Sequence, residues 1–241
     1  MLRVHSIESF GTHEGPGIRF VLFLQGCLFK CLYCHNPDTI PLEGGKLKSP
    51  EDILKQVIQV KPYFRGKGGF TVSGGEPLLQ AKELLPLFKL LHHEHINIAV
   101  DTNGFPWNED IQNLIPLIDL FLIDVKHIND DRHKKVTGKS NENTLKFIEY
   151  LQSQGKHIWI RYVLVPGYTD QPEYIEELGK KLSKYSVIER IEILPYHQLG
   201  VHKWKELGRD YGLEGVPSAK MQQAEAAKLL LEKWFDKVVI R

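Results

Sequence analysis

The run QGCLFKCLYCHNP, residues 25–37, holds every cysteine of this 241-residue chain. The three thiols, Cys27, Cys31 and Cys34, follow the spacing Cys-x3-Cys-x2-Cys. Three cysteines cannot form a closed set of disulfides, and they are one short of a four-cysteine zinc or iron–sulfur site. Three thiolates on a short loop can instead hold three irons of a 4Fe–4S cube and leave the fourth iron open to a small molecule. The run therefore predicts an iron–sulfur cluster at which chemistry takes place.

Two other uses of these cysteines stay open. Zinc could be held by the three thiolates and His35, although a ligand adjacent to Cys34 would strain a tetrahedral site. The cysteines could also be unligated core residues, because a free thiol behaves as a small hydrophobe. The close spacing, with no cysteine elsewhere in the chain, favours the cluster over both.

The composition is that of an ordinary globular protein, with 42% hydrophobic and 25% charged residues. A net charge of +1 lacks the basic excess of a nucleic-acid binder. The start, MLRVHSIESF, has no apolar secretory segment, and no run approaches the roughly 18 apolar residues of a membrane span. Clustered thiols without an export signal predict a cytoplasmic location. We expect a monomer that binds neither nucleic acid nor membrane.

Short β-branched and aromatic runs alternate with segments of helical periodicity, which predicts parallel strands joined by right-handed crossovers. The predicted strands are Arg19–Leu24, Gly69–Val72, Ile96–Val100, Leu120–Asp124, Ile158–Val165 and Arg190–Leu194. The predicted helices are one that begins after the N-cap Ser49, then Ala81–His93, Glu109–Ile118, Asn141–Gln154, Pro172–Lys184 and Ser218–Phe235. The pattern indicates an α/β fold in a single domain over residues 1–241. Residues 197–217 lack a periodic pattern and contain four glycines, so we expect a flexible flap there.

Unusual residues follow the predicted strands, at the edge where parallel α/β sheets bind ligands. They are the cysteine loop, Gly74-Gly75-Glu76, Asp101-Thr102-Asn103-Gly104, Asp124-Val125-Lys126, Pro166-Gly167 and Tyr196-His197. Each of these could be only a tight turn or an internal ion pair when it is taken alone. Paired glycines also let a backbone approach a ligand closely. Their coincidence at one edge predicts a binding site.

These residues together resemble the radical S-adenosylmethionine (SAM) superfamily, and within it the glycyl radical enzyme activases that act on pyruvate formate-lyase. The resemblance runs from about His5 to the C-terminal helix. It is carried by the cysteine spacing and by the segments 14–19, 25–27, 33–36, 101–105, 159–162 and 194–197. The family often has Asp where this chain has Glu14. The resemblance implies a partial (β/α)6 TIM-like barrel, which agrees with the six units found from periodicity.

The resemblance also implies an oxidoreductase mechanism. SAM would chelate the open iron, and its reductive cleavage would yield a 5′-deoxyadenosyl radical that takes a hydrogen atom from a backbone glycine of pyruvate formate-lyase. Cys27, Cys31 and Cys34 would ligate the 4Fe–4S cluster. The residues implied at SAM are Tyr33, Cys34, His35, Gly74, Gly75, Glu76, Asp101, Asp124, Val125, Lys126 and His197. A monovalent cation would be held by Asp101, Thr102 and Asp124, and the substrate peptide would meet Glu14, Gly15 and Arg161.

An electron donor, flavodoxin or ferredoxin, is implied as a second partner. The stretch from Lys46 to Lys67 carries six lysines and arginines against Glu51 and Asp52, and we predict that it helps to dock this acidic donor. Two alternatives remain. Activases of other glycyl radical enzymes often carry an insert with extra cysteines, for which residues 36–49 are too short. A zinc-stabilised binding protein would be recognised by zinc without acid-labile sulfide.

Overall fold

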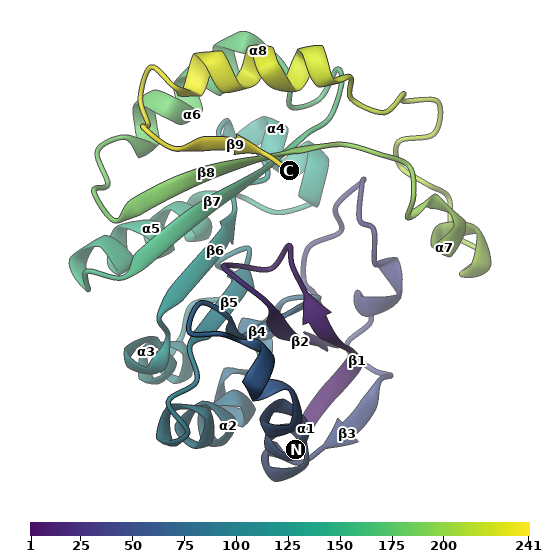
Figure 1. The fold of residues 1–241 in the computed structure, drawn as a ribbon. Helices are drawn as coiled ribbons and strands as arrows, with labels where there is room; N and C mark the ends of the chain where they lie inside the picture. The colour runs from purple at the N-terminus through teal and green to yellow at the C-terminus, as the bar shows by residue number, and fades with distance from the viewer. The chain divides into compact units, whose positions relative to one another are not determined.

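The computed structural model describes all residues, 1–241, which form two compact units. The first unit comprises Met1–Leu28 and Thr39–Leu122, drawn in purple to teal in Figure 1. The second unit comprises Phe29–Asp38 and Ile123–Arg241. The boundary falls inside the cysteine run, so Cys27 belongs to the first unit and both other cysteines belong to the second. The expectation of a single domain stays a prediction.

The first unit is a sheet in the order β3–β1–β2–β4–β5 with helices along it. Strands β2, β4 and β5 are parallel, whereas β1 pairs antiparallel with both β2 and β3. The strands are β1 (Leu2–Gly11), β2 (Arg19–Leu24), β3 (Lys46–Lys48), β4 (Gly69–Gly74) and β5 (Ile98–Thr102). The helices are α1 (Pro50–Val60), α2 (Ala81–His93) and α3 (Glu109–Leu114), with short 3₁₀ turns at Lys61–Tyr63, Pro77–Gln80 and Ile115–Leu117.

The second unit has three parallel strands in the order β7–β8–β9, and β6 (Leu120–Asp124) crosses the boundary between the units. Helices α6 and α8 pack side by side, and α8 covers β8 and β9 (Figure 1). The strands are β7 (His157–Leu164), β8 (Ile188–Pro195) and β9 (Val238–Ile240). The helices are α4 (Asp130–Thr137), α5 (Glu142–Ser153), α6 (Pro172–Leu182), α7 (Val201–Glu206) and α8 (Met221–Leu231), and a 3₁₀ turn lies at Pro37–Thr39.

Local sequence explains where the helices begin and end. Ser49 caps α1 by accepting a hydrogen bond from the Asp52 amide at 3.1 Å, which confirms the predicted start. Asn129 caps α4 in the same way, and Gly138 ends this helix in the left-handed region at φ 78°. No side-chain hydrogen bond caps α7, so contacts with other segments must hold this short helix.

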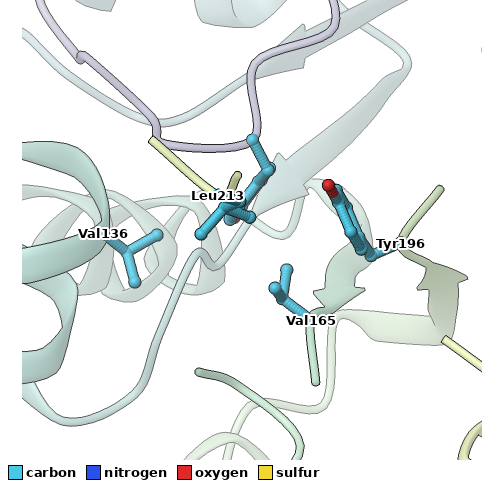
Figure 2. Close-up of a cluster of buried hydrophobic side chains, with 5 residues drawn as sticks. Val136, Val165, Tyr196 and Leu213 are labelled. Atoms are coloured by element: carbon cyan, nitrogen blue, oxygen red, sulfur yellow. The ribbon is translucent and has the colours of Figure 1, made fainter. Parts of the chain in front are cut away.

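Each unit has its own hydrophobic core. In the first, Phe70 on β4 is fully buried, stacks on Phe20 with ring centroids 6.1 Å apart and meets Phe88 of α2 edge-on. In the second, a buried cluster joins the cysteine loop to the chain around residues 196–213 (Figure 2). No helix is long and apolar enough to cross a membrane.

Candidate active site

The carboxylate of Glu76 ties together the ends of β4 and β5 in the first unit. It is 1% exposed. Its Oε1 accepts hydrogen bonds from the Leu78 amide at 3.0 Å and from the Thr102 hydroxyl at 2.6 Å, and its Oε2 accepts one from the Asn103 amide at 2.8 Å. Burial pushes the pKa of Glu76 upward, whereas the three donors at its two oxygens favour the charged form. Glu76 thus fixes two predicted site loops relative to each other.

The paired glycines bring the end of β4 against the start of the cysteine loop. Gly74 has φ 114°, and a Cβ there would lie 2.3 Å from the Leu24 amide nitrogen. A Cβ on Gly75 would lie 2.1 Å from the Gly26 carbonyl oxygen. The two glycines were predicted to let the backbone approach a ligand closely. In the structure they let it approach the protein's own backbone at Leu24 and Gly26, directly before Cys27.

Gly75→Ala should therefore destabilise the first unit strongly. The added methyl group meets backbone rather than a movable side chain, so we expect a loss of about 3 kcal/mol or more in the free energy of unfolding. Gly66→Ala is the matched control. Gly66 has φ 73° but no atom within 4 Å of the added Cβ, so its cost should be only the left-handed strain of about 1–2 kcal/mol. Urea unfolding of the two variants measures both, and equal costs would contradict the packing role of Gly75.

Polar side chains at the carboxyl ends of β4 and β5 lie together, as the sequence predicted. The Ser73 hydroxyl donates to Asp101 Oδ2 at 2.9 Å. Asn103, which sequence reasoning treated as part of a turn, places its Nδ2 4.0 Å from the sulfur of Cys27. This contact adds a hydrogen-bond donor to the thiol, and the Asn-Gly turn pattern alone gave no sign of it.

The predicted peptide-contact residues Glu14 and Gly15 lie at the amino ends of β2 and β4, away from Cys27 at the carboxyl end of β2. The Thr71 hydroxyl donates to the Glu14 carbonyl oxygen at 2.7 Å. The buried Arg19 guanidinium donates to Thr71 Oγ1 at 2.9 Å and to Asn97 Oδ1 at 2.8 Å. Burial lowers the pKa of Arg19 to about 10, which still leaves it charged at neutral pH. This segment is therefore anchored by its backbone.

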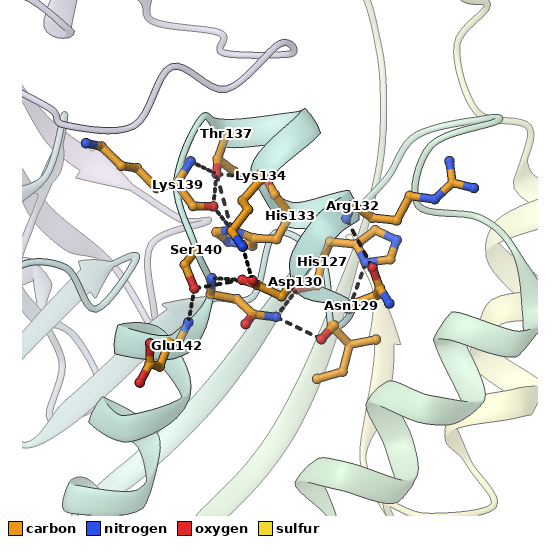
Figure 3. Close-up of polar contacts among 12 residues, drawn as sticks. His127, Asn129, Asp130, Arg132, His133, Lys134, Thr137, Lys139, Ser140 and Glu142 are labelled. Atoms are coloured by element: carbon orange, nitrogen blue, oxygen red, sulfur yellow. Dashed lines mark hydrogen bonds and ion pairs between the residues drawn. The ribbon is translucent and has the colours of Figure 1, made fainter.

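In the second unit, the cysteine loop is docked on the C-terminal end of α4. The amides of Lys30 and Leu32 donate to the carbonyls of Thr137 and Val136, both at 2.9 Å. These are carbonyls that a helix end leaves without an intrahelical partner. Hydrogen bonds within the helix and to the residues that follow it stabilise α4 (Figure 3). His133 bonds to Thr137, and Asp130 accepts from the Ser140 hydroxyl and the Asn141 amide. The sequence pattern did not predict helix α4.

The residues after β6 form a charged pair beside the loop. Lys126 Nζ lies 2.8 Å from Asp124 Oδ2, so these two side chains form an ion pair. Burial disfavours the Lys126 ammonium, but Asp124 outweighs it and holds the pKa of Lys126 well above its usual value. Lys126 Nζ also lies 5.8 Å from the ring of buried Tyr33. The Val125 amide donates to the Arg161 carbonyl at 3.0 Å, which fixes this turn to β7.

His35 and His197, both predicted to meet SAM, are in contact. Their ring centroids are 4.3 Å apart, and His35 Nε2 lies 3.0 Å from the His197 carbonyl oxygen. Two residues that the sequence did not single out, Lys203 and Trp204 of α7, also contact the cysteine loop. The stretch around them has no periodic signal that could have identified them.

Arg161 lies on β7 opposite Glu192 of β8, with its Nε 3.8 Å from Glu192 Oε2. Glu192 is 1% exposed, and it also pairs with Arg190 at 3.3 Å and with Arg241 at 3.1 Å. The predicted peptide contact at Arg161 is therefore part of a charged group across the strands of the second unit.

The three cysteines are half-buried and outside any disulfide, so they are available to hold a cluster. Burial raises the pKa of the Cys34 thiol, so a bound metal would have to favour its thiolate form. Hydrogen-bond donors reach two of the sulfurs, from Asn103 Nδ2 to Cys27 and from the Asn36 amide to Cys34. Thiolates with hydrogen-bond donors around the sulfurs are the usual setting of iron–sulfur clusters. The residues present therefore fit this group.

The predicted site residues divide between the two units. Those in the first are Glu14, Gly15, Cys27, Gly74, Gly75, Glu76, Asp101 and Thr102, and those in the second are Cys31, Tyr33, Cys34, His35, Asp124, Val125, Lys126, Arg161 and His197. Within the units, Glu76 meets Thr102, Asp124 meets Lys126, and His35 meets His197, whereas Glu14 and Gly15 lie in the turn that precedes β2. The predicted cation ligands come from both units.

Comparisons with known proteins agree on one family. The sequence model of the radical SAM superfamily matches residues 21–180. The chain is 43% identical over 240 residues to the pyruvate formate-lyase 1-activating enzyme of Escherichia coli K12, covering 98% of both chains. It is 47% identical over 221 residues to the pyruvate formate-lyase-activating enzyme of Staphylococcus epidermidis, covering 88% of both.

Two solved structures support the fold. A domain of the pyruvate-formate lyase-activating enzyme from Bacteroides vulgatus superposes with a TM-score of 0.61 at 24% identity, over 72% of this chain and 99% of that one. SuiB of Streptococcus suis, bound to its precursor peptide SuiA, superposes with a TM-score of 0.70 at 16% identity, over 98% of this chain and 50% of that one. Both likenesses confirm the predicted α/β class with a mostly parallel sheet.

Proposed function

The chain belongs to the radical SAM superfamily and, within it, to the pyruvate formate-lyase-activating enzymes, and we propose that it generates a glycyl radical on pyruvate formate-lyase. The observation that carries the proposal is the 43% identity to the Escherichia coli activating enzyme over 98% of both chains. Membership of the superfamily implies a 4Fe–4S cluster and SAM. The reduced cluster, once SAM is bound, supplies the one-electron cleavage by which a hydrogen atom is removed from glycine.

The three thiolates of Cys27, Cys31 and Cys34 would hold the cluster. The turn at Gly74 and Gly75, fixed by the buried Glu76 carboxylate, would present its backbone to the methionyl amino group of SAM. This geometry supports the assignment because a turn held by three hydrogen bonds needs little reorganisation when a ligand binds.

The remaining SAM contacts would come from the second unit and from β5. Lys126, held charged by Asp124, suits the SAM carboxylate, and the Asp124 carboxylate suits the ribose hydroxyls. The stacked rings of His35 and His197 offer a surface for the adenine. The other proposed contacts are Tyr33, Val125 and Asp101, and Asp101, Thr102 and Asp124 would hold the monovalent cation.

The glycine loop of the lyase would meet Glu14, Gly15 and Arg161. The backbone of Glu14 is held by Thr71, and Arg161 is oriented by the buried Glu192, so both segments are ordered without a partner. Preorganised contacts of this kind lower the entropy lost when a peptide binds.

Flavodoxin or ferredoxin would deliver the electron, and the basic stretch from Lys46 to Lys67 would attract it. The structure pairs two of its lysines internally, Lys55 with Asp52 and Lys61 with Glu94. On strand β3, Lys46 is exposed and Lys48 is half-buried. We place the enzyme in the cytoplasm, because three clustered thiols outside any disulfide need a reducing environment. We also propose that it acts as a monomer.

The proposed function predicts transfer of deuterium from a glycine to SAM-derived product. An anaerobic reaction would contain the reconstituted protein, a reductant, SAM and a lyase-loop peptide deuterated at the glycine α-carbon. Mass spectrometry should find deuterium in the 5′-deoxyadenosine, both with dithionite and with reduced flavodoxin as the reductant. Unlabelled product would point to another substrate. Absence of product from protein that holds an intact cluster would overturn the proposal, and bound zinc without sulfide would identify the zinc-stabilised alternative.

A further inference from the structure

Helix α7 contacts the second half of the cysteine loop through two polar side chains. The indole Nε1 of Trp204 donates to the carbonyl oxygen of Cys34 at 2.8 Å. The ammonium of Lys203 lies 2.9 Å from Asn36 Oδ1 and 3.2 Å from Asp38 Oδ2. These bonds join positions more than 160 residues apart in the sequence. Trp204 thus binds the backbone of the last cysteine, and Lys203 binds two side chains that follow it.

Two glycines that flank α7, Gly200 and Gly212, also lie in close contact with the cysteine loop. A Cβ on Gly200 would lie 2.7 Å from the Cα of His35. A Cβ on Gly212 would lie 2.6 Å from the Leu32 side chain. Any larger residue at position 200 would therefore collide with the backbone of His35. Because the two segments are in such close contact, the cysteine loop cannot move far without displacing residues 197–217.

The 197–217 segment is itself anchored in the core of the second unit. Leu213 is 1% exposed and packs in one cluster with Tyr33, Val165 and Tyr196 (Figure 2). The hydroxyls of Tyr196 and Tyr211 are 2.8 Å apart, and the Tyr211 ring meets the Trp204 ring edge-on. The segment thus has its own support and can act as a fixed point for the loop.

Two connections lead from α7 to Cys34. One is the direct bond from Trp204 to the Cys34 carbonyl, which sets the orientation of that peptide plane. The other runs from Lys203 to the side chain of Asn36, whose backbone amide donates to the Cys34 sulfur. An amide donor to a ligand sulfur is one of the interactions that set the reduction potential of an iron–sulfur cluster.

We propose that Trp204 and Lys203 are positioning residues that hold Cys34 and its Asn36 amide donor in the ligating arrangement before a cluster is assembled. The inference rests on the proposed role of Cys34 as a cluster ligand. In this proposal, residues 197–217 support the second half of the cysteine loop already in the cofactor-free protein.

Trp204→Phe tests this directly, because phenylalanine keeps an aromatic ring beside Tyr211 and removes the N–H donor. Trp159→Phe is the matched control. Trp159 lies on β7 in the same unit and donates its own indole Nε1 to Glu189 at 3.2 Å, so its donor is engaged outside the cysteine loop. Hydrogen–deuterium exchange of the cluster-free protein, followed by mass spectrometry, should show exchange over residues 29–38 rising about five- to tenfold in Trp204→Phe, as expected for loss of one net hydrogen bond. Trp159→Phe should leave these residues unchanged.

A second reading uses the reconstituted cluster. The electron paramagnetic resonance spectrum of the reduced cluster should change in Trp204→Phe and in Lys203→Met, but not in Trp159→Phe or in Lys233→Met. Lys233 pairs with Glu176 at 2.7 Å on the surface of the same unit, so its loss controls for removal of an ion pair. If Trp204→Phe does not fold, Lys203→Met carries the test by both measurements.

Unchanged exchange over residues 29–38 together with an unchanged spectrum would overturn the inference. Failure of the proposed function gives a different result. Wild-type protein that assembles no cluster would remove Cys34 as a ligand, and with it the positioning role, even if the exchange difference between the two Trp variants were present.

Discussion

Replacing Cys31 by serine should leave a folded protein that holds no intact cluster and cleaves no SAM. A serine hydroxyl is a far weaker iron ligand than a thiolate, and the chain has no fourth cysteine to substitute for it. The loss of turnover should exceed the roughly 100-fold that removal of an outer partner of a metal site costs. The fold should survive, because the loop is held on α4 by the amides of Lys30 and Leu32, which the substitution leaves in place.

Iron and acid-labile sulfide analysis, with 5′-deoxyadenosine measured in the same samples, checks this result. Lys30→Ser is the control on the same loop, because Lys30 is exposed and its amide bond to α4 is kept. It should retain the cluster and turnover. Wild-type iron content and retained SAM cleavage in Cys31→Ser would remove this thiol from the ligand set.

Glu76→Gln should cost about 1–3 kcal/mol of unfolding free energy, the usual cost of leaving a buried donor without an acceptor. The carboxylate accepts from three donors on two sides. Glutamine has one acceptor oxygen, so in either orientation its NH2 group faces a protein N–H or O–H. The ends of β4 and β5 would then separate, and the Gly74–Gly75 turn would lose its fixed position.

Urea unfolding of the cluster-free protein measures this cost without involving SAM. Glu43→Gln gives the matched control in the same unit, since Glu43 is exposed and the change should stay within about 0.5 kcal/mol. If Glu76→Gln were as stable as Glu43→Gln, the hydrogen bonds of Glu76 would not be what holds the two loops together.

The elements with a strong local pattern could be predicted from the sequence. The bounds of β2, β6 and α2 are those expected, and β4, β5, β7 and β8 differ from expectation by at most two residues at their ends. Strand β1 was not predicted because the residues after Val4 are mostly polar, and His5 to Phe10 are only half-buried or exposed, so no clear alternation of apolar and polar residues marks it. Its pairing with β2 and β3, which involves distant residues, determines its conformation.

Two helices were missed for different reasons. Helix α4 is strongly polar, so no apolar stripe marked it, although Asn129 and Gly138 were recognisable end signals. Helix α7 has only six residues and no side-chain cap, and its contacts with the cysteine loop could not be inferred from local sequence. The expectation that residues 197–217 form a flexible flap stays a prediction, and the contacts of Trp204 and Leu213 show what any movement would have to break.

The candidate site was foreseeable where residues follow parallel strands. Glu76 meets Thr102 and Asn103 because neighbouring parallel strands end at the same edge of the sheet. Asp124 meets Lys126 because side chains two positions apart in an extended segment share a face. The donors to the cysteine loop were not foreseeable. Asn103 and Trp204 act through a single side-chain atom each, and their partners are set by the folded chain rather than by spacing.

The bonds that hold the cysteine loop go mostly to its main chain. The amides of Gly26, Cys27, Lys30 and Leu32 donate to the backbone carbonyls of Thr39, Ile40, Thr137 and Val136, and the Cys34 carbonyl receives Trp204. Main-chain atoms are the same whatever side chain a residue carries. The path of the loop is thus encoded largely by residues outside it, so the exposed side chain of Lys30 can be exchanged without disturbing the bond that its amide makes to α4.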